Sequence, residues 1–280
     1  MSDQPLPIPR ELAGAIAERR DRLGPLARQV LYYESIGSTN DAAASLAASG
    51  HGEGIVVIAD SQTAGRGRRG RSWFSPPGAG LYVSVILAPG RARVAPDRAT
   101  SLLTLAAGVA LSEAVEQCTG LAPAIKWPND LLVERRKLAG ILAEGVAQPA
   151  STGLQAVVLG FGINVMPAVY PPDLASRVTS VEGELGRGID RAALCAESLA
   201  ALAARYHDLL EGRYDAILDA WRSRSFGSRG ARVAWDTPSG VQTGITEGID
   251  EMGALLVRTA RSLERIVAGE VRWELHAASD

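Results

Sequence analysis

Residues 123–145, PAIKWPNDLLVERRKLAGILAEG, restrict the fold more than any other stretch, because two polar turns divide them into three short apolar segments. Residues 128–130 (PND) and 134–136 (ERR) have the composition of turns. Connections this short join antiparallel strands, since parallel neighbours need a crossover of a dozen or more residues. The stretch therefore predicts strand, turn, strand, turn, strand.

The rest of the chain mixes helices with strands. Helices are predicted over residues 10–33 (interrupted near Gly24), from a cap at residues 38–40, and over 97–120 and 190–223. Buried strands are predicted over 54–60, 80–89 and 154–165. From Gly227 the pattern changes to short strands separated by Gly, Pro or Asp turns, which is typical of a small β-barrel. Together these segments predict an α+β fold: a mixed β-sheet with flanking helices, followed by a small C-terminal barrel.

Composition excludes several classes of function. The 280 residues suggest one or two domains, and a net charge of −2 with a pI near 6.0 does not favour nucleic-acid or membrane partners. The N-terminus has no apolar signal core and no apolar run reaches the roughly 18 residues of a membrane span, so we expect a cytoplasmic protein. Two cysteines and three scattered histidines provide neither a disulfide framework nor a zinc site.

The sequence GRGRRGRSW, residues 65–73, predicts an anion-binding loop. Its glycines let a ligand approach the backbone, and its arginines suit phosphate or carboxylate. The match to G-x-G-x-x-G is not a dinucleotide fingerprint, because residues 71–80 contain two prolines and two glycines and do not open a helix. A P-loop is excluded on the same ground. A solvated surface loop and a small nucleic-acid patch remain as alternatives.

Lysine is rare in this chain: 27 of the 29 basic residues are arginines, and the two lysines are Lys126 and Lys137. Arginine cannot replace lysine where a compact, mobile ammonium must follow charge through a reaction. The two lysines are therefore candidate catalytic residues, with a plain composition bias as the alternative.

Five segments stand out in order along the chain: STN (38–40), SQTAGRGRRGRSWFSP (61–76), KWPNDLL (126–132), KLAGILAE (137–144) and GFGINV (160–165). In their order and spacing they resemble the biotin–protein ligases. The resemblance covers roughly residues 30–276, including the C-terminal module.

The resemblance implies a fold and an activity. We expect a biotin- and ATP-binding catalytic domain in residues 1–226 and an SH3-like β-barrel in residues 227–280. The expected reaction converts biotin and ATP to biotinyl-5′-AMP and pyrophosphate, and then transfers the biotinyl group to one lysine of a biotin carboxyl carrier protein. Mg²⁺ is expected together with ATP. Cations that cancel the repulsion between carboxylate and phosphate suit this chemistry.

The resemblance also assigns roles to residues. Catalytic roles fall to Lys137, Arg68 and Lys126. Biotin binding falls to Ser38, Thr39, Asn40, Gln62, Gly65, Arg66, Gly67, Arg68, Lys137, Gly140, Gly160 and Gly162, the last three by leaving room for the ligand. ATP binding falls to Arg68, Arg71, Trp73, Lys126, Asn129, Lys137 and Asn164. Asp130 either takes part in magnesium binding or shapes the turn. Trp73 and Trp127 either contact the ligands or pack in the core.

Other points stay open in the sequence. Only 37 residues precede the STN segment, too few for the N-terminal DNA-binding domain of some members of this family, so we expect no repressor role and no nucleic-acid partner. The base that deprotonates the acceptor lysine is not identified, and either a monomer or a homodimer is compatible with the sequence. A lipoate or octanoate transferase and a nucleic-acid-binding module are the alternative functions.

Overall fold

The computed structural model describes residues 4–147, 156–238 and 240–273, and its larger part is built on a mixed sheet of seven strands. The strands β1 and β2 are parallel, and all other neighbours are antiparallel. The predicted hairpins of residues 123–145 are confirmed as β4, β5 and β6. In spatial order the strands are β1 (Gln29–Ile36), β2 (Ile55–Gln62), β3 (Gly80–Leu87), β7 (Ala156–Asn164), β6 (Arg136–Val146), β5 (Asp130–Val133) and β4 (Ala124–Lys126).

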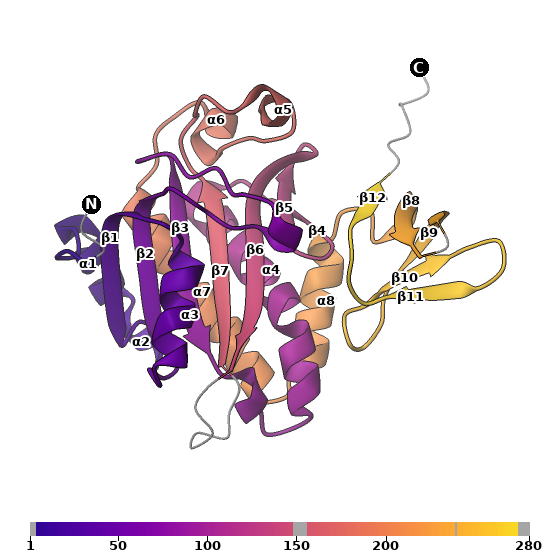
Figure 1. Ribbon diagram of the computed structural model, residues 1–280, viewed down its shortest axis with the longest axis horizontal. Coiled ribbons are helices and arrows are strands. Elements are labelled where there is room, and N and C mark those ends of the chain that lie inside the picture. The colour runs from indigo at the N-terminus through magenta and orange to yellow at the C-terminus, as the bar shows by residue number, and fades with distance from the viewer. Residues whose placement is uncertain (1–3, 148–155, 239, 274–280) are drawn as a thin grey trace.

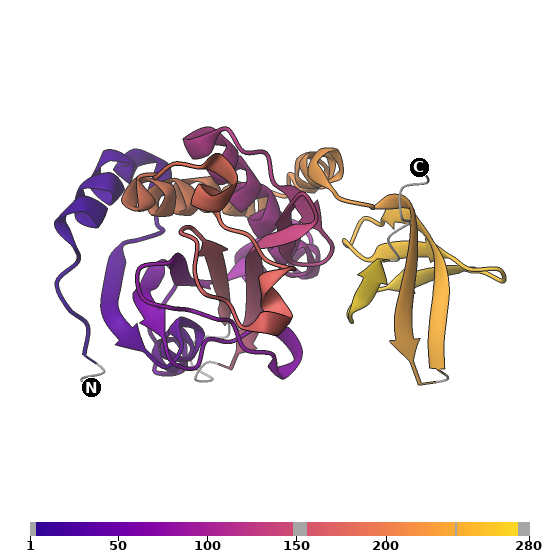
Figure 2. The ribbon, with the colours of Figure 1, turned by 90° about the horizontal axis from the view of Figure 1, so that it is seen from above.

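Helices cover both faces of this sheet (Figures 1 and 2). One face carries α3 (Thr39–Ala48), which contacts β2, β3 and β7. The opposite face carries the long helix α4 (Pro96–Thr119), and α7 (Arg191–Leu210) packs on α4. The remaining helical elements are α1 (Arg10–Glu18), α2 (Arg20–Leu23), α5 (Pro172–Ala175), α6 (Val181–Leu185), α8 (Tyr214–Arg224), and the short 3₁₀ turns η1 (Arg68–Gly70) and η2 (Pro89–Arg91).

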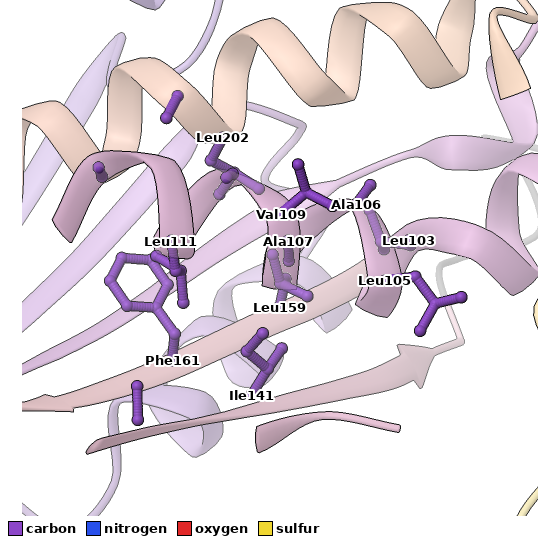
Figure 3. Close-up of a cluster of buried hydrophobic side chains, with 14 of the residues drawn as sticks. Leu103, Leu105, Ala106, Ala107, Val109, Leu111, Ile141, Leu159, Phe161 and Leu202 are labelled. Atoms are coloured by element: carbon purple, nitrogen blue, oxygen red, sulfur yellow. The ribbon is translucent and has the colours of Figure 1, made fainter. Parts of the chain in front are cut away.

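The main core lies between α4 and the sheet. Figure 3 shows leucine, valine and alanine side chains of α4 above Ile141, Leu159 and Phe161 of the strands β6 and β7. Within the described residues, α4 is the one helix long and apolar enough to cross a membrane by length and composition, but 72% of its apolar window is buried inside the protein. Its hydrophobicity is thus explained by contacts with the sheet below and α7 above.

The C-terminal strands form a separate antiparallel sheet (Figure 2). Their spatial order is β11 (Leu263–Ile266), β10 (Leu255–Arg258), β9 (Gly240–Ile249), β8 (Arg229–Thr237) and β12 (Val271–Trp273). Among the described residues β11 and β12 are edge strands and do not pair, so closure into a barrel is not confirmed. The boundary at residues 226 and 227 stays a prediction.

One expectation about local structure was wrong, and two short helices were not predicted. Residues 29–33 are predicted as helix but lie in β1, because their pairing with β2 outweighs local helical spacing. The short helices α5 and α6 carry no periodic signal in the sequence. Residues 154 and 155 of the predicted strand 154–165 and the last seven residues of the predicted C-terminal domain, 274–280, lie outside the described residues.

A buried carboxylate joins the N-terminal helices to α7. Glu197 is 1% exposed, and its oxygens accept hydrogen bonds from Arg19 Nε (2.9 Å) and from Arg22 Nη1 and Nη2 (2.8 and 2.5 Å). These hydrogen bonds, from Arg22 above all, hold the pKa of Glu197 below its usual value. The contribution of Glu197 to stability is therefore present above the unfolded-state pKa and is lost as the pH falls through the folded pKa.

We expect Glu197→Gln to lower the free energy of unfolding by about 2 kcal/mol at pH 7, because a buried carboxylate with two arginine partners is replaced by a neutral amide. Urea unfolding from pH 7 down to pH 3 measures this. The difference between wild type and variant should shrink as the pH falls below the usual range for glutamate. A difference that stays constant with pH would contradict the linkage.

Candidate functional site

One cavity collects residues from the start of α3, the loop after β2, and the strands β6 and β7. Most of the residues predicted from the sequence line this cavity. They are Ser38, Thr39, Asn40, Gln62, Arg66, Gly67, Arg68, Trp73, Asn129, Lys137, Gly140, Gly160 and Gly162. Gly65, Arg71, Lys126, Asp130 and Asn164 are not part of the lining.

The polar part of the cavity begins where α3 starts. Ser38 is the N-cap, and its hydroxyl accepts a hydrogen bond from the Asp41 amide (3.4 Å). The Thr39 amide donates to Gln62 Oε1 (2.9 Å), and Gln62 Nε2 donates to Ser75 Oγ (2.9 Å). Because a backbone amide can only donate, the orientation of the Gln62 amide group is determined. A neutral ligand would meet fixed donors and acceptors here.

The glycine–arginine loop folds back on itself across the cavity. An antiparallel bridge joins Arg66 and Ser72, and Arg69 has a φ of 58° at the tip. Gly65 has no room for a side chain, since an added Cβ would lie 2.5 Å from the Trp73 carbonyl oxygen. The Arg66 guanidinium pairs with Asp41 Oδ1 and Glu144 Oε1, each at 2.6 Å. The Arg66 side chain is therefore already neutralised.

Two other cations line the cavity, and in the described residues only one of them has a carboxylate partner. Arg68 is half-buried and donates to Asn129 Oδ1 (3.1 Å), and burial lowers the pKa of its guanidinium. In the described parts of the chain Arg68 forms no ion pair. Lys137 Nζ lies 2.7 Å from Asp130 Oδ1 and 5.1 Å from the centre of the Trp73 ring. A half-buried arginine without a carboxylate partner favours binding of an anionic group.

Lys126 and Arg71 face the C-terminal sheet instead of the cavity lining. Lys126 Nζ lies 5.0 Å from the centre of the Trp273 ring, and burial lowers the pKa of its ammonium. Arg71 forms an ion pair with Glu270, just before β12. Two of the four cations predicted to bind ATP thus contact the C-terminal module.

Asn164 is buried beside the backbone of Lys137. Its Nδ2 donates to the Thr179 carbonyl (2.9 Å) and lies 3.4 Å from the Lys137 carbonyl. Its amide nitrogen therefore holds the start of β6 in place.

The glycines of the cavity make room for side chains of the protein itself. A Cβ on Gly160 would lie 1.9 Å from Asn40 Oδ1, and one on Gly162 would lie 2.4 Å from Trp73 Nε1. A Cβ on Gly140 would come within 2.9 Å of the same indole. These glycines were expected to leave room for a ligand, and here they first accommodate Asn40 and Trp73.

Trp127 packs in the core. It is 3% exposed, and its Nε1 donates to the Gly253 carbonyl (3.0 Å). Of the two tryptophans in the motifs, Trp73 is thus the one that lines the cavity.

A metal site formed by protein ligands alone is not evident in the described ranges, where no group of three or more His, Cys, Asp or Glu residues gathers. Asp130 opens β5, and its carboxylate is the counter-ion of Lys137. Sequence reasoning also missed Glu144, Ser84 and the apolar lining residues Ile141, Leu142 and Phe161. The carboxylate Glu144 lies inside the KLAGILAE segment, which was the available signal.

Comparison with known proteins gives a consistent result. The model of the "Biotin/lipoate A/B protein ligase family" matches residues 32–164, and that of the "Biotin protein ligase C terminal domain" matches residues 230–272. The chain is 37% identical over 252 residues to the biotin–[acetyl-CoA-carboxylase] ligase of Mycobacterium tuberculosis, covering 87% of this chain and 88% of that protein. It is 34% identical over 264 residues to the bifunctional ligase/repressor BirA of Bacillus subtilis, covering 92% and 79%.

Solved structures agree. The biotin protein ligase from Aquifex aeolicus in complex with biotin and ATP superposes with a TM-score of 0.72 at 26% sequence identity, covering 88% of this chain and 99% of that one.

Proposed function

This chain belongs to the biotin/lipoate A/B protein ligase family, and on that basis we propose that it is a biotin–protein ligase. It activates biotin with ATP to form biotinyl-5′-AMP and pyrophosphate. It then passes the biotinyl group to one lysine of a biotin carboxyl carrier protein.

This proposal rests on one observation: the cations Arg68 and Lys137 line the same cavity as a group of neutral polar side chains. That group consists of Ser38, Thr39, Asn40 and Gln62. In the first step a carboxylate oxygen of biotin forms a bond to the α-phosphorus, and the bond to pyrophosphate breaks. Two anions must approach each other, and negative charge grows on the leaving group. Preorganised cations reduce the cost of both events.

Lys137 has the central role in this proposal. Its ammonium, which lies beside Asp130, contacts the biotin carboxylate and the α-phosphate. Arg68 covers the mixed anhydride, and Lys126 and Arg71 lie on the side of the pyrophosphate. Trp73, Asn129 and Asn164 contribute to the ATP site.

The ring of biotin fits the polar part of the cavity. Its ureido group needs a few fixed donors and acceptors in a mainly apolar pocket. Ser38, Thr39, Asn40 and Gln62 offer such groups beside Ile141, Leu142 and Phe161. The backbone of Gly65, Arg66 and Gly67 covers the ligand, and Gly140, Gly160 and Gly162 set the walls.

Mg²⁺ accompanies the phosphates of ATP in this proposal. Such an ion is usually held by substrate phosphates and one or two carboxylates, so a cage of protein ligands is not required. Asp130 is a carboxylate close to Lys137 and is suited to contribute one oxygen. We further propose that residues 1–226 form the catalytic domain and residues 227–280 an SH3-like barrel. The reaction takes place in the cytoplasm.

Calorimetry with biotin, before and after addition of ATP and Mg²⁺, tests this function. We expect binding of biotin alone, and release of pyrophosphate once ATP is present. Turnover of ATP that depends on lipoate and not on biotin would instead identify a lipoate ligase. Steeply salt-dependent binding of nucleic acid without affinity for biotin would overturn the proposal.

A further inference from the structure

The strand β6 carries a carboxylate that contacts two parts of the cavity at once. We propose that Glu144 is a positioning residue for biotin binding, which orients Asn40 with one oxygen and anchors the glycine–arginine loop with the other. This inference rests on the proposed function, because biotin is the ligand whose binding it explains.

The first contact determines the orientation of the Asn40 amide group. Asn40 is 5% exposed; its Nδ2 lies 3.0 Å from Glu144 Oε2, and its Oδ1 lies 2.7 Å from the hydroxyl of Ser84, which is completely buried on β3. An ionised carboxylate only accepts hydrogen bonds, so the amino group of Asn40 must face Glu144. The carbonyl oxygen must then face Ser84, whose hydroxyl donates to it.

This orientation sets what Asn40 offers to a ligand. One N–H of its amino group is taken by Glu144, and the second remains as a donor at the cavity that Asn40 lines. Gly160 provides the space in which Asn40 lies, since any Cβ there would overlap Oδ1. A reversed amide would leave its carbonyl oxygen against the oxygens of Glu144.

The second contact anchors the loop. Glu144 Oε1 accepts from Arg66 Nη2 at 2.6 Å, and Asp41 Oδ1 accepts from Arg66 Nη1 at the same distance. The Asp41 side chain is 58% exposed and the Glu144 side chain 32% exposed. Arg66 lies at the start of the loop that covers the cavity, so Glu144 connects that loop to the groups at the start of α3.

Only a carboxylate can satisfy both contacts. It presents an acceptor oxygen to Asn40 and another to Arg66, whereas an amide has one acceptor oxygen and must direct its amino group at one of these two donors. The isosteric change Glu144→Gln therefore leaves one contact without an acceptor while keeping the size of the side chain.

Titration calorimetry with biotin and, separately, with ATP tests the proposal. We expect Glu144→Gln to weaken biotin binding by about 10-fold, because its single amide oxygen cannot serve both Asn40 and Arg66 and one of these donors then meets an amino group, and to change ATP binding by less than about 2-fold. The matched control is Asp41→Asn, which removes the same charge from Arg66 but does not touch Asn40; about a 2-fold effect is expected, as for an exposed pair. If Glu144 had a merely structural role, Glu144→Gln would weaken the binding of both biotin and ATP.

A second variant keeps the test valid if Glu144→Gln folds poorly. Ser84→Ala removes the other partner of Asn40, and with it the contact of Ser84 Oγ with Thr39 Oγ1 (2.8 Å), without touching Arg66. We expect it to weaken biotin binding by about 5-fold and leave ATP binding unchanged. The inference would be overturned if Glu144→Gln and Asp41→Asn bound biotin with equal affinity, or if Ser84→Ala had no effect on biotin binding. As long as the wild-type protein binds biotin, neither result affects the proposed function. Failure of the wild-type protein to bind biotin would overturn the proposed function itself.

Discussion

Replacing Lys137 by arginine will lower the rate of biotinyl-AMP formation by about 100-fold or more, although the substitution conserves charge. The lysine side chain passes closely over Gly140: a Cβ added there would lie 3.1 Å from Lys137 Cε and 3.2 Å from Nζ. The Trp73 ring and the Asp130 carboxylate also lie beside it. A planar guanidinium is larger than an ammonium and directs its donors in a fixed fork, so it cannot occupy this space or follow charge from carboxylate to phosphate.

Pyrophosphate release with saturating biotin and ATP measures this effect. Lys126→Arg makes the same change in the chain's other lysine and serves as a comparison, because Lys126 is assigned to the side of the pyrophosphate, lies outside the cavity lining and has its Nζ 5.0 Å from the centre of the Trp273 ring. A much smaller loss is expected there. If Lys137→Arg retained adenylation close to that of wild type, the central role assigned to Lys137 would be wrong.

The sequence predicted the elements whose signals are local. The strands β4, β5 and β6 follow from two turns within residues 123–145, and α4 follows from an apolar pattern that extends over its 24 residues. The strand β1 was missed because its evidence is not local: residues 29–36 are held by parallel pairing with β2, which no pattern within the segment reveals.

The same distinction applies to the site. The motifs predict that Arg68, Lys137 and the residues at the start of α3 belong to one site. In the structure these residues line one cavity. What the motifs could not reveal is how polar atoms pair across strands. The contacts of Glu144 with Asn40 and Arg66 span 104 and 78 residues, and the glycines of β7 match side chains that arrive from α3 and the loop.

Replacing Arg68 by alanine will make the enzyme release its adenylate, with an increase in the rate of biotinyl-AMP appearance in solution of about 10-fold or more. Arg68 is half-buried at the cavity and, in the described parts of the chain, has an amide partner and no carboxylate partner. Its charge is therefore available to the phosphate of the adenylate, and a charge-assisted hydrogen bond of this kind contributes about 1.5 to 3 kcal/mol. Removing it also loosens the loop that excludes water from a mixed anhydride.

The measurement separates enzyme-bound from free biotinyl-AMP by rapid filtration, without an acceptor protein. Arg69→Ala is a matched control: it removes the neighbouring arginine of the same loop, whose side chain is exposed and does not line the cavity. We expect the control to retain its adenylate as wild type does, because an exposed, solvated guanidinium contributes little to holding a buried phosphate. Equal release rates from wild type and Arg68→Ala would show that the loop retains the intermediate through its backbone alone, and Arg68 would lose the role given to it here.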